Sequence, residues 1–509
     1  FKQKTAYEIM PSLVGSEMCI RDRTWSEHCK HKIFNAEIDY ADGERHLVID
    51  SLFNTYIRRA TEELRTRCPW LLSVFHDNAG VIAFNDRWSL AYKVETHNSP
   101  SALDPYGGAM TGIVGVNRDP FGTGRGAKLM VNVWGYCLGS PFYEGHLPRG
   151  LLHPRRIRDG VHKGVIDGGN QSGIPYGRGW EIFDERYIGK PLVYCGTVGI
   201  LPRTVCGEPS EKKYARPGDL VVMAGGRIGK DGIHGATFSS EELREESPTQ
   251  AVQIGDPITQ KKLTDFLLEA RDLGLYTCIT DNGAGGLSSS VGEMCRYSGG
   301  AEIDLAKAPL KYAGLDPWEI LLSEAQERMT LAVPPDKIDA FLDLARRREV
   351  EATVLGTFTD TGKFHVRYGE RTVAYVNLDF LHEGLPRMRL KAVWQRPRWG
   401  EPALEAAPDP QTALADLLAE LNICSIEKKA RQYDHEVKGL SVVKPFVGVR
   451  CDVPSDATVF MVDYESVEGI VLTEGVNPHY SDVDTYHMTA SIIDLAVRRA
   501  VGTGAPPGL

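Results

Sequence analysis

The sequence lacks several features that would assign it to particular protein classes. None of its ten cysteines belongs to a CxxC pair, so neither a zinc ribbon nor a disulfide framework is predicted. No apolar run approaches the roughly 18 to 20 residues of a membrane span. The net charge of −10 gives no general surplus of basic residues, which argues against nucleic-acid binding through phosphates. We therefore expect a cytoplasmic chain with reduced thiols that binds neither membranes nor nucleic acid.

What is present is the composition of an ordinary globular protein. The 509 residues are 42% hydrophobic and 25% charged, so each domain can bury a sizeable core. Length alone suggests roughly three domains. Residues 1–23 lack the apolar centre of a signal peptide and are predicted to be a linker or foreign sequence without function.

One stretch, residues 91–119, concentrates the chemistry. Its period of two places Lys93, Glu95 and His97 on one face of a strand predicted over 90–97, and the stretch ends on Arg118-Asp119. A lysine suits phosphate oxygens, carboxylates suit magnesium, and a histidine can transfer protons. The pattern indicates a magnesium-nucleotide site, and a solvated charged strand face is the alternative.

Two further local patterns could contribute to a metal or nucleotide site. His28, Cys29 and His31 lie close together, which is compatible with a metal site or with a catalytic or nucleotide-contacting loop. Asp281 is predicted at the end of a strand, before a glycine turn and a helix over 287–297. That position suits magnesium and phosphate, although a simple helix-capping aspartate is nearly as well supported.

Three glycine-rich segments could approach a ligand closely. Residues 121–128 fail the P-loop pattern, and 165–173 are interpreted as a strand running into glycine-rich backbone that could open a helix at an anion site. Turn formation is the favoured alternative for both. Residues 225–235 combine five glycines with Arg227 and Lys230, which favours a phosphate cradle over a structural loop.

The remaining expectations concern secondary structure. An amphipathic helix is predicted over 53–68, and a proline-rich linker over 384–411. Further strands and helices are predicted at 81–84, 191–201, 220–223, 257–273 and 412–421.

Short motifs recur at one fixed spacing. Asp104-x-Tyr106 and Gly122-Thr123-Gly124 return as Asp484-x-Tyr486 and Gly502-Thr503-Gly504, in both cases 380 positions later. Equal spacing favours an internal duplication. At the same spacing, the charged groups of the first copy are replaced, since Lys93, Glu95, His97 and Asp119 correspond to Thr473, Gly475, Asn477 and Arg499.

Many motifs in one order make the chain resemble phosphoribosylformylglycinamidine synthase, over about residues 24–509. The motifs are TWSEHC, YKVETHN-x-PSALDPYGGAMTG, NRD, GKDGIHGATFSSEE, QIGDP, TDNGAGGLSSS, SEAQERM and YDHEVKGLSVVKPFVG.

The resemblance implies an α+β and α/β fold like that of aminoimidazole ribonucleotide synthetase. After residues 1–23, it implies a β-rich N-domain over 24–210, an α/β C-domain over 211–383, a linker with a helix over 384–450, and the truncated start of a second N-domain over 451–509. It also implies a ligase that phosphorylates the amide oxygen of formylglycinamide ribonucleotide with ATP. Ammonia from a glutaminase domain or subunit then displaces phosphate from the iminophosphate to give the amidine.

The resemblance also implies residue roles, with ATP and Mg²⁺ as cofactors. His28 and His97 would be catalytic, and His31 and Lys93 would bind ATP. Glu95 would bind one magnesium ion, and Asp119 and Asp281 would bind a second. The substrate positions would be Thr96, His97, Asn98, Ser99, Arg118, Gln253, Glu324, Ala325 and Gln326.

Two positions depart from the family pattern, and two alternatives remain open. Ser99 stands where VETHNHP has its second histidine, and Ala325 where SESQ has serine, so altered contacts are expected rather than lost chemistry. A nucleotide-binding module without turnover, or a related synthetase such as aminoimidazole ribonucleotide synthetase, is the alternative function. Because the second-half metal motif and C-domain are not in the sequence, it is interpreted as an internal fragment.

Overall fold

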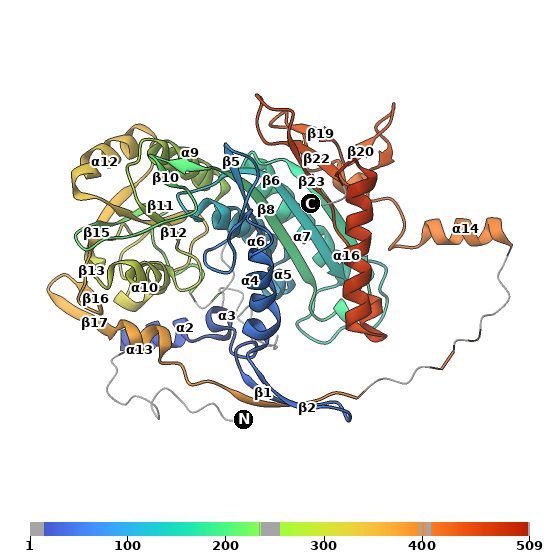
Figure 1. The fold of residues 1–509 in the computed structure, drawn as a ribbon, viewed down its shortest axis with the longest axis horizontal. Coiled ribbons are helices and arrows are strands. Elements are labelled where there is room, and N and C mark those ends of the chain that lie inside the picture. The colour runs from blue at the N-terminus through green and yellow to red at the C-terminus, as the bar shows by residue number, and fades with distance from the viewer. Residues whose placement is uncertain are drawn as a thin grey trace.

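The computed structural model describes residues 15–233, 235, 255–395, 400, 401, 403 and 409–506. Two mixed α/β units lie side by side in it, each built around one large sheet (Figure 1). Gln253 and most of 234–254 are outside the described residues.

The first unit contains a six-stranded sheet with the order β3-β4-β5-β8-β6-β7. Its elements are β3 (Leu71–Ser73), β4 (Gly80–Ala83), β5 (Trp88–Thr96), α5 (Asn98–Leu103), α6 (Pro105–Phe121), β6 (Lys128–Leu138), α7 (Pro154–Gln171), β7 (Tyr176–Phe183) and β8 (Leu192–Pro202). The predicted strands at 81–84, 90–97 and 191–201 are confirmed to within two residues.

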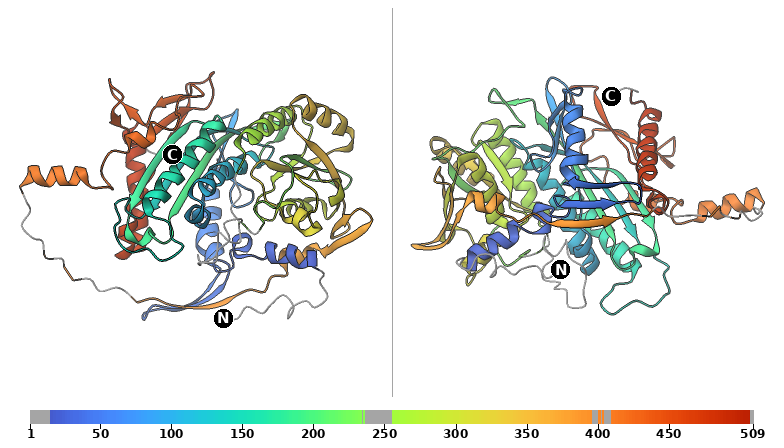
Figure 2. Two further views of the ribbon diagram at one scale, coloured as in Figure 1. Left: turned by 180° about the vertical axis from the view of Figure 1, so that it is seen from behind. Right: turned by 60° about the horizontal axis from the view of Figure 1, so that its bottom comes forward.

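Helices α6 and α7 cover one face of this sheet, and α7 is seen crossing it from behind in Figure 2. The interpretation of 165–173 as a strand before an anion-binding helix is wrong, because these residues lie at the end of α7 and in the following turn. Helix packing explains Gly168 of this segment and Gly164 just before it: a Cβ on Gly164 would lie 2.3 Å from the carbonyl oxygen of Tyr106 on α6, and one on Gly168 would lie 2.5 Å from Ile113. Close packing therefore overrides the weak helix propensity of glycine.

The second unit contains a seven-stranded sheet with the order β12-β14-β11-β15-β13-β16-β17. Its elements are β11 (Leu220–Gly225), α9 (Pro257–Asp272), β12 (Cys278–Asp281), α10 (Gly286–Ser298), β13 (Ala301–Asp304), α11 (Pro317–Leu322), β14 (Arg328–Val333), α12 (Ile338–Arg347), β15 (Ala352–Phe358), β16 (Lys363–Tyr368), β17 (Arg371–Asn377) and α13 (Leu378–Glu383).

Strand alternation explains how this second sheet buries both faces. On β11, Val221 and Met223 pack into the core with α10 and α11, whereas Val222 and Ala224 pack into the core with α9 and α12. A run that is apolar at every position is expected for a strand covered on both sides. The helices predicted over 257–273 and 287–297 are confirmed as α9 and α10.

The N-terminal segment runs along the base of both units. It contains α2 (Gly15–Thr24), α3 (Glu27–Lys30), β1 (Glu37–Ala41), β2 (His46–Asp50), a π-helical turn (Phe53–Arg58) and α4 (Arg59–Arg65). The predicted amphipathic helix over 53–68 is helical only to Arg65, and neither the π-turn nor α4 contains a buried residue. Strand β1 pairs in parallel with β18 (Arg389–Val393) (Figure 2, right). The segment that precedes the first unit therefore meets the segment that follows the second unit.

The C-terminal part holds α14 (Pro410–Ala419), α15 (Glu427–Ala430), β19 (Ser441–Val443), β20 (Phe446–Val447), β21 (Val453–Pro454), β22 (Thr458–Met461), β23 (Gly469–Leu472) and α16 (Thr485–Gly502). Phe460, Val462 and Ile470 pack on the sheet face of the first unit that α6 and α7 leave uncovered. Helix α14, predicted over 412–421, extends away from both units (Figure 1).

Among the described residues, none of the helices combines the length and the apolar character that crossing a membrane requires.

Candidate active site

Strand β5 carries two of the groups predicted from its alternation, and the third follows directly after it. Lys93 Nζ lies 3.0 Å from Glu95 Oε2, so their side chains share one face of the strand as predicted. His97 follows the strand directly and precedes α5, where its backbone N–H donates to Val193 O at 2.8 Å. A Cβ on Gly112 of α6 would lie 3.0 Å from the His97 Cβ, so this glycine permits the helix to approach the histidine closely.

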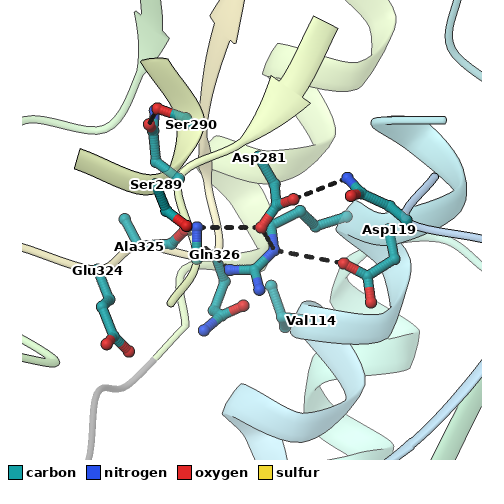
Figure 3. A network of polar contacts seen from close by, with 12 residues as sticks. Val114, Asp119, Asp281, Ser289, Ser290, Glu324, Ala325 and Gln326 are labelled. Atoms are coloured by element: carbon teal, nitrogen blue, oxygen red, sulfur yellow. Dashed lines mark hydrogen bonds and ion pairs between the residues drawn. The ribbon is translucent and has the colours of Figure 1, made fainter. Parts of the chain in front are cut away.

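The last turn of α6 and the end of β12 bring the remaining charged groups to the same place. Asp281 accepts hydrogen bonds from Asn78 Nδ2 at 2.7 Å and from Gly283 N at 3.0 Å. The Arg118 guanidinium lies between Asp281, at 2.9 Å, and Asp119, at 3.8 Å (Figure 3). Lys93 Nζ lies 3.4 Å from Asp119 Oδ2, which joins this group to the face of β5.

These groups line a cavity of about 540 Å³ between the two units, named here the central cavity. Of the residues singled out from the sequence, it is lined by His28, His31, Lys93, Glu95, Thr96, His97, Asn98, Arg118, Asp119, Asp281, Glu324 and Gln326. Residues from four separate parts of the chain therefore meet at one site.

Two of the predicted substrate residues do not line this cavity. Ser99 is fully buried in α5. Ala325 is buried as well, and its backbone oxygen accepts a hydrogen bond from Arg118 Nη1 at 3.1 Å. Ala325 therefore orients the arginine through its backbone, and its lack of a hydroxyl does not disturb that contact. Gln253 lies outside the described residues.

The glycine-rich loop at 225–235 contributes less to the cavity than a phosphate cradle would require. Only Gly232 and Gly235 of its described glycines line the cavity. Both cations of the loop are paired: Arg227 with Glu351 at 2.8 Å, and Lys230 with Glu319 at 2.9 Å. The phosphate-cradle interpretation stays a prediction.

Sequence reasoning missed several residues of the site. Asp77, Asn78, Ser289 and Glu293 also line the central cavity. Asp77 forms a buried ion pair with Lys213 at 2.5 Å, and Lys213 also donates to the backbone oxygens of Gly122 and Ile279. Lys213 thus ties the end of α6 to β12. The available signal was weak, namely the polar run His76-Asp77-Asn78 ahead of the strand predicted at 81–84, and the i, i+4 spacing of Ser289 and Glu293 on a predicted helix.

A second cavity of about 870 Å³, named here the adjoining cavity, shares Asp77, Lys93 and Glu293 with the first. Its wall carries several aromatic side chains, namely Phe53, Phe75, Tyr92 and Tyr297. Both volumes lie within the range of small-molecule sites.

The charges of the site stabilise one another. Asp119, and then Glu95, raise the pKa of Lys93 above its usual value against the effect of burial. Burial acts to raise the pKa of Glu95, but Lys93 and His28 together lower it below its usual value. Lys93 and Glu95 are therefore both charged at neutral pH.

Two other groups have pKa values displaced by burial. Burial lowers the pKa of His97 to about 4, so its imidazole is neutral at pH 7 and able to accept a proton. Nδ1 of His97 has no hydrogen-bond partner among the described residues. Burial raises the pKa of Asp119, although Lys93 opposes this effect.

The fit of a metal ion can be judged from the donor set. Within the part of the chain that the structure describes, no three His, Cys, Asp or Glu side chains are placed to share one ion, and this includes His28, Cys29 and His31. Glu95, Asp119 and Asp281 nevertheless line one cavity and outnumber its two cations, Lys93 and Arg118. Magnesium is usually held by one or two carboxylates together with phosphate oxygens, so this donor set fits it.

Comparison with known protein families matches both units. Residues 76–201 match the family model of the AIR synthase related protein, N-terminal domain. Residues 216–369 match the model of the AIR synthase related protein, C-terminal domain. The expected fold class, a β-rich N-domain and an α/β C-domain, is confirmed.

Curated relatives extend the similarity to nearly the whole chain. The phosphoribosylformylglycinamidine synthase subunit PurL of Methanopyrus kandleri is 35% identical over 503 residues, which is 97% of this chain and 63% of the relative. The subunit of the same description from Thermoplasma acidophilum is 34% identical over 505 residues, 97% of this chain and 62% of the relative. The chain thus spans less than two thirds of the length of these relatives.

Solved structures agree with this assignment. The structure described as T. maritima PurL complexed with FGAR has a TM-score of 0.71 and 27% identity, covering 97% of this chain and 70% of the other. That of T. maritima PurL complexed with ATP has a TM-score of 0.67 and 25% identity, covering 96% and 68%. With matches to both domain models and to relatives of one description, the chain belongs to the phosphoribosylformylglycinamidine synthase family.

Proposed function

We propose that the protein catalyses the ATP-dependent conversion of formylglycinamide ribonucleotide to formylglycinamidine ribonucleotide, with ammonia as the nitrogen donor. The observation that carries the proposal is the central cavity, where Lys93, Glu95, His97, Asp119 and Asp281 converge from β5, α6 and β12. The relatives' description as phosphoribosylformylglycinamidine synthase subunits supports it.

The reaction has two steps in this proposal. The amide oxygen of the substrate attacks the γ-phosphorus of ATP, and ADP leaves, which gives an iminophosphate. Ammonia then attacks the imidate carbon, a proton is removed from the nitrogen, and inorganic phosphate leaves. The protein would therefore be a ligase that forms a C–N bond.

Lys93 and Arg118 supply the positive charge that phosphoryl transfer needs. Their side chains lie among three carboxylates, at 2.9 to 3.8 Å. Such transfers depend on charge neutralisation and positioning more than on covalent help. We assign Lys93 to the ATP phosphates and Arg118 to the substrate, together with Thr96, Asn98, Glu324 and Gln326.

His97 is assigned as the proton acceptor in the ammonia step. Its imidazole is neutral at pH 7 because burial lowers its pKa to about 4. The residue lines the central cavity, and its buried Nδ1 has no hydrogen-bond partner among the described residues. His28 faces the same cavity and is assigned as the second catalytic histidine.

We propose that Glu95, Asp119 and Asp281 hold magnesium when ATP is bound. Bound magnesium would neutralise the phosphate oxygens during transfer. Lys93 and Arg118, which now balance these carboxylates, would then be released in part to contact the nucleotide and the substrate.

The nucleoside of ATP is assigned to the adjoining cavity. The two cavities share Lys93, which supports a position for the triphosphate at their junction. Aromatic side chains such as Phe75 and Tyr297 suit a planar base. His31 lines both cavities and is assigned to the nucleotide. A glutaminase domain or subunit is the proposed source of ammonia.

The test is an assay of this chain with ATP, magnesium, formylglycinamide ribonucleotide and ammonium chloride, combined with calorimetric titration of ATP. We expect stoichiometric ADP, phosphate and amidine. In the His97→Ala variant, turnover should fall about 10²- to 10⁴-fold while ATP affinity is kept. Unchanged turnover in this variant would reject the role of His97.

A nucleotide-binding module without turnover is the second candidate. ATP binding without product would favour it. Absence of ATP binding would reject both candidates.

A further inference from the structure

The catalytic turn that carries His28 is held by the end of a helix far away in the sequence. Trp25 Nε1 donates to the backbone oxygen of Leu381 at 2.9 Å, and Lys30 Nζ donates to that of His382 at 2.7 Å. Both acceptors belong to the last turn of α13, whose final carbonyls have no partner within the helix. The helix dipole also favours a cation such as the Lys30 ammonium at this end.

The same helix end is tied to the wall of the cavities. The His382 ring nitrogen Nε2 lies 3.0 Å from the backbone oxygen of Gly292 on α10. Glu293, the next residue on α10, lines both cavities. Burial lowers the pKa of His382 to about 4, so the ring is neutral at pH 7 and Nε2–H can donate to this oxygen. Helix α13 therefore contacts the α3 turn on one side and α10 on the other.

Packing around this contact leaves the α3 turn little freedom. Trp25 is buried, and its ring lies 5.0 Å from that of Phe380 on α13. Asn35 Nδ2 donates to the backbone oxygen of Lys30 at 2.9 Å, and the backbone oxygen of Asn35 accepts from Arg387 Nε at 2.9 Å. Residues 25–35 are thus fastened to residues 381–387 at several points.

The α3 turn borders both cavities. His28 lines the central cavity, Lys30 lines the adjoining cavity, and Cys29 and His31 line both. A displacement of this turn would move His28 and change the lining of both cavities together.

We infer that the end of α13 is a dock that fixes the α3 turn, and that Lys30 and Trp25 are positioning residues for His28. The dock rests on the proposed function and deepens it, since it places His28 against the central cavity. Lys30 acts through its bond to the His382 carbonyl and needs no contact with either ligand.

The test uses the thiol of Cys29, which is partly exposed and lies between His28 and Lys30. The rate of Cys29 alkylation by iodoacetamide, measured by peptide mass spectrometry, reports how firmly the turn is held and does not depend on turnover. We expect Lys30→Met to accelerate alkylation at least threefold and to lower kcat/KM at least tenfold. Lys30→Arg should restore most of both, because a guanidinium can still donate to the His382 carbonyl.

Matched controls separate docking from other effects. Lys32→Met removes a nearby lysine, two residues after Lys30, that lines neither cavity. It should change neither the alkylation rate of Cys29 nor kcat/KM. Trp25→Phe keeps the aromatic ring but removes the bond to Leu381, and should accelerate Cys29 alkylation even if Lys30→Met is poorly folded. The circular dichroism spectrum of each variant verifies folding.

The outcomes distinguish this inference from the proposed function. Unchanged Cys29 alkylation in both Lys30→Met and Trp25→Phe overturns the dock. Weaker ATP binding with unchanged alkylation in Lys30→Met overturns it as well, since Lys30 would then contact the nucleotide directly. Accelerated alkylation in a chain that makes no amidine supports the dock while the proposed function fails.

Discussion

Two regions of the molecule share a sequence pattern but differ in environment. In the first, β4, β5 and α6 lead to the central cavity, and in the second, β22, β23 and α16 follow in the same order. The recurring motifs explain the likeness of the two helices. Asp104 accepts from Gly107 N at the start of α6, and Asp484 accepts from His487 N at the start of α16.

The ends of the two helices are matched in the same way. Thr123 Oγ1 donates to Asp119 O at 2.7 Å, and Thr503 Oγ1 donates to Arg499 O at 2.8 Å. Gly124 and Gly504 both adopt positive φ, which glycine tolerates. The repeated motifs are therefore start and stop signals of one helix, which act locally and survive without the chemistry.

What differs is burial and charge. Most residues of α6 are buried, whereas α16 has no buried residue in the part of the chain that the structure describes. Thr473, Gly475, Asn477 and Arg499 replace the lysine, carboxylates and histidine of the first copy. The comparison teaches that the start and stop signals of the helix and the charged groups of the central cavity are independent properties of the recurring pattern.

The largest effect is expected from removing the Lys93 charge from the first of the two regions. Lys93→Met should weaken ATP binding about ten- to hundredfold, because an ammonium that contacts phosphate contributes roughly 1.5 to 3 kcal/mol. Turnover should fall further, since the same charge supports the transfer step. Thr473→Val, at the matched position, should change neither quantity. Calorimetric titration and the ammonia-dependent assay measure both, and equal losses in the two variants would contradict the assignment of the site to the first copy.

Packing provides the second comparison. Ile113 on α6 is 0% exposed, whereas Ile493, its counterpart on α16, is 58% exposed. Ile113→Ala should lower the free energy of unfolding by about 2 to 5 kcal/mol because it leaves a cavity. Ile493→Ala should lower it by less than about 0.5 kcal/mol. Urea denaturation tests this pair, and a comparable loss for Ile493→Ala would show that α16 is covered in solution.

A smaller effect concerns pH. Burial, and then Lys429, lowers the pKa of His162 on α7 to about 3. In the unfolded chain a histidine has a pKa of about 6.5. Between these values the unfolded state binds more protons, so the folded state loses stability as pH falls from about 6.5 towards 3.

The matched variants isolate this contribution. In His162→Gln, the loss of unfolding free energy between pH 7 and pH 4.5 should be smaller than in the parent chain by on the order of 2 kcal/mol. His487→Gln, at an exposed position of α16, should leave the loss unchanged. Urea denaturation at the two pH values measures both, and an identical pH dependence in all three proteins would mean that His162 is not titrated as its burial implies.

Local patterns predicted the strand that carries the candidate site, but they gave a wrong secondary structure for 165–173. Alternation placed Lys93 and Glu95 on one face of a strand over 90–97, and β5 spans Trp88–Thr96. The same reasoning took Gly168 as a turn former, although it lies where α7 packs against α6, whereas Gly173 does lie in a turn with positive φ. A glycine that permits a turn and a glycine that permits close helix packing have the same letter, and only the neighbour distinguishes them.

The sequence by itself determined the helix caps, the alternation that groups Lys93 with Glu95, and the aspartate at the end of β12, because each depends on residues a few positions apart. Only the tertiary structure decided that Arg118 lies between Asp119 and Asp281, that Lys213 pairs with Asp77, and that α13 holds the turn of His28. These contacts join residues that are remote in the chain. Their formation depends on how the two sheets pack together, a relationship that no local pattern encodes.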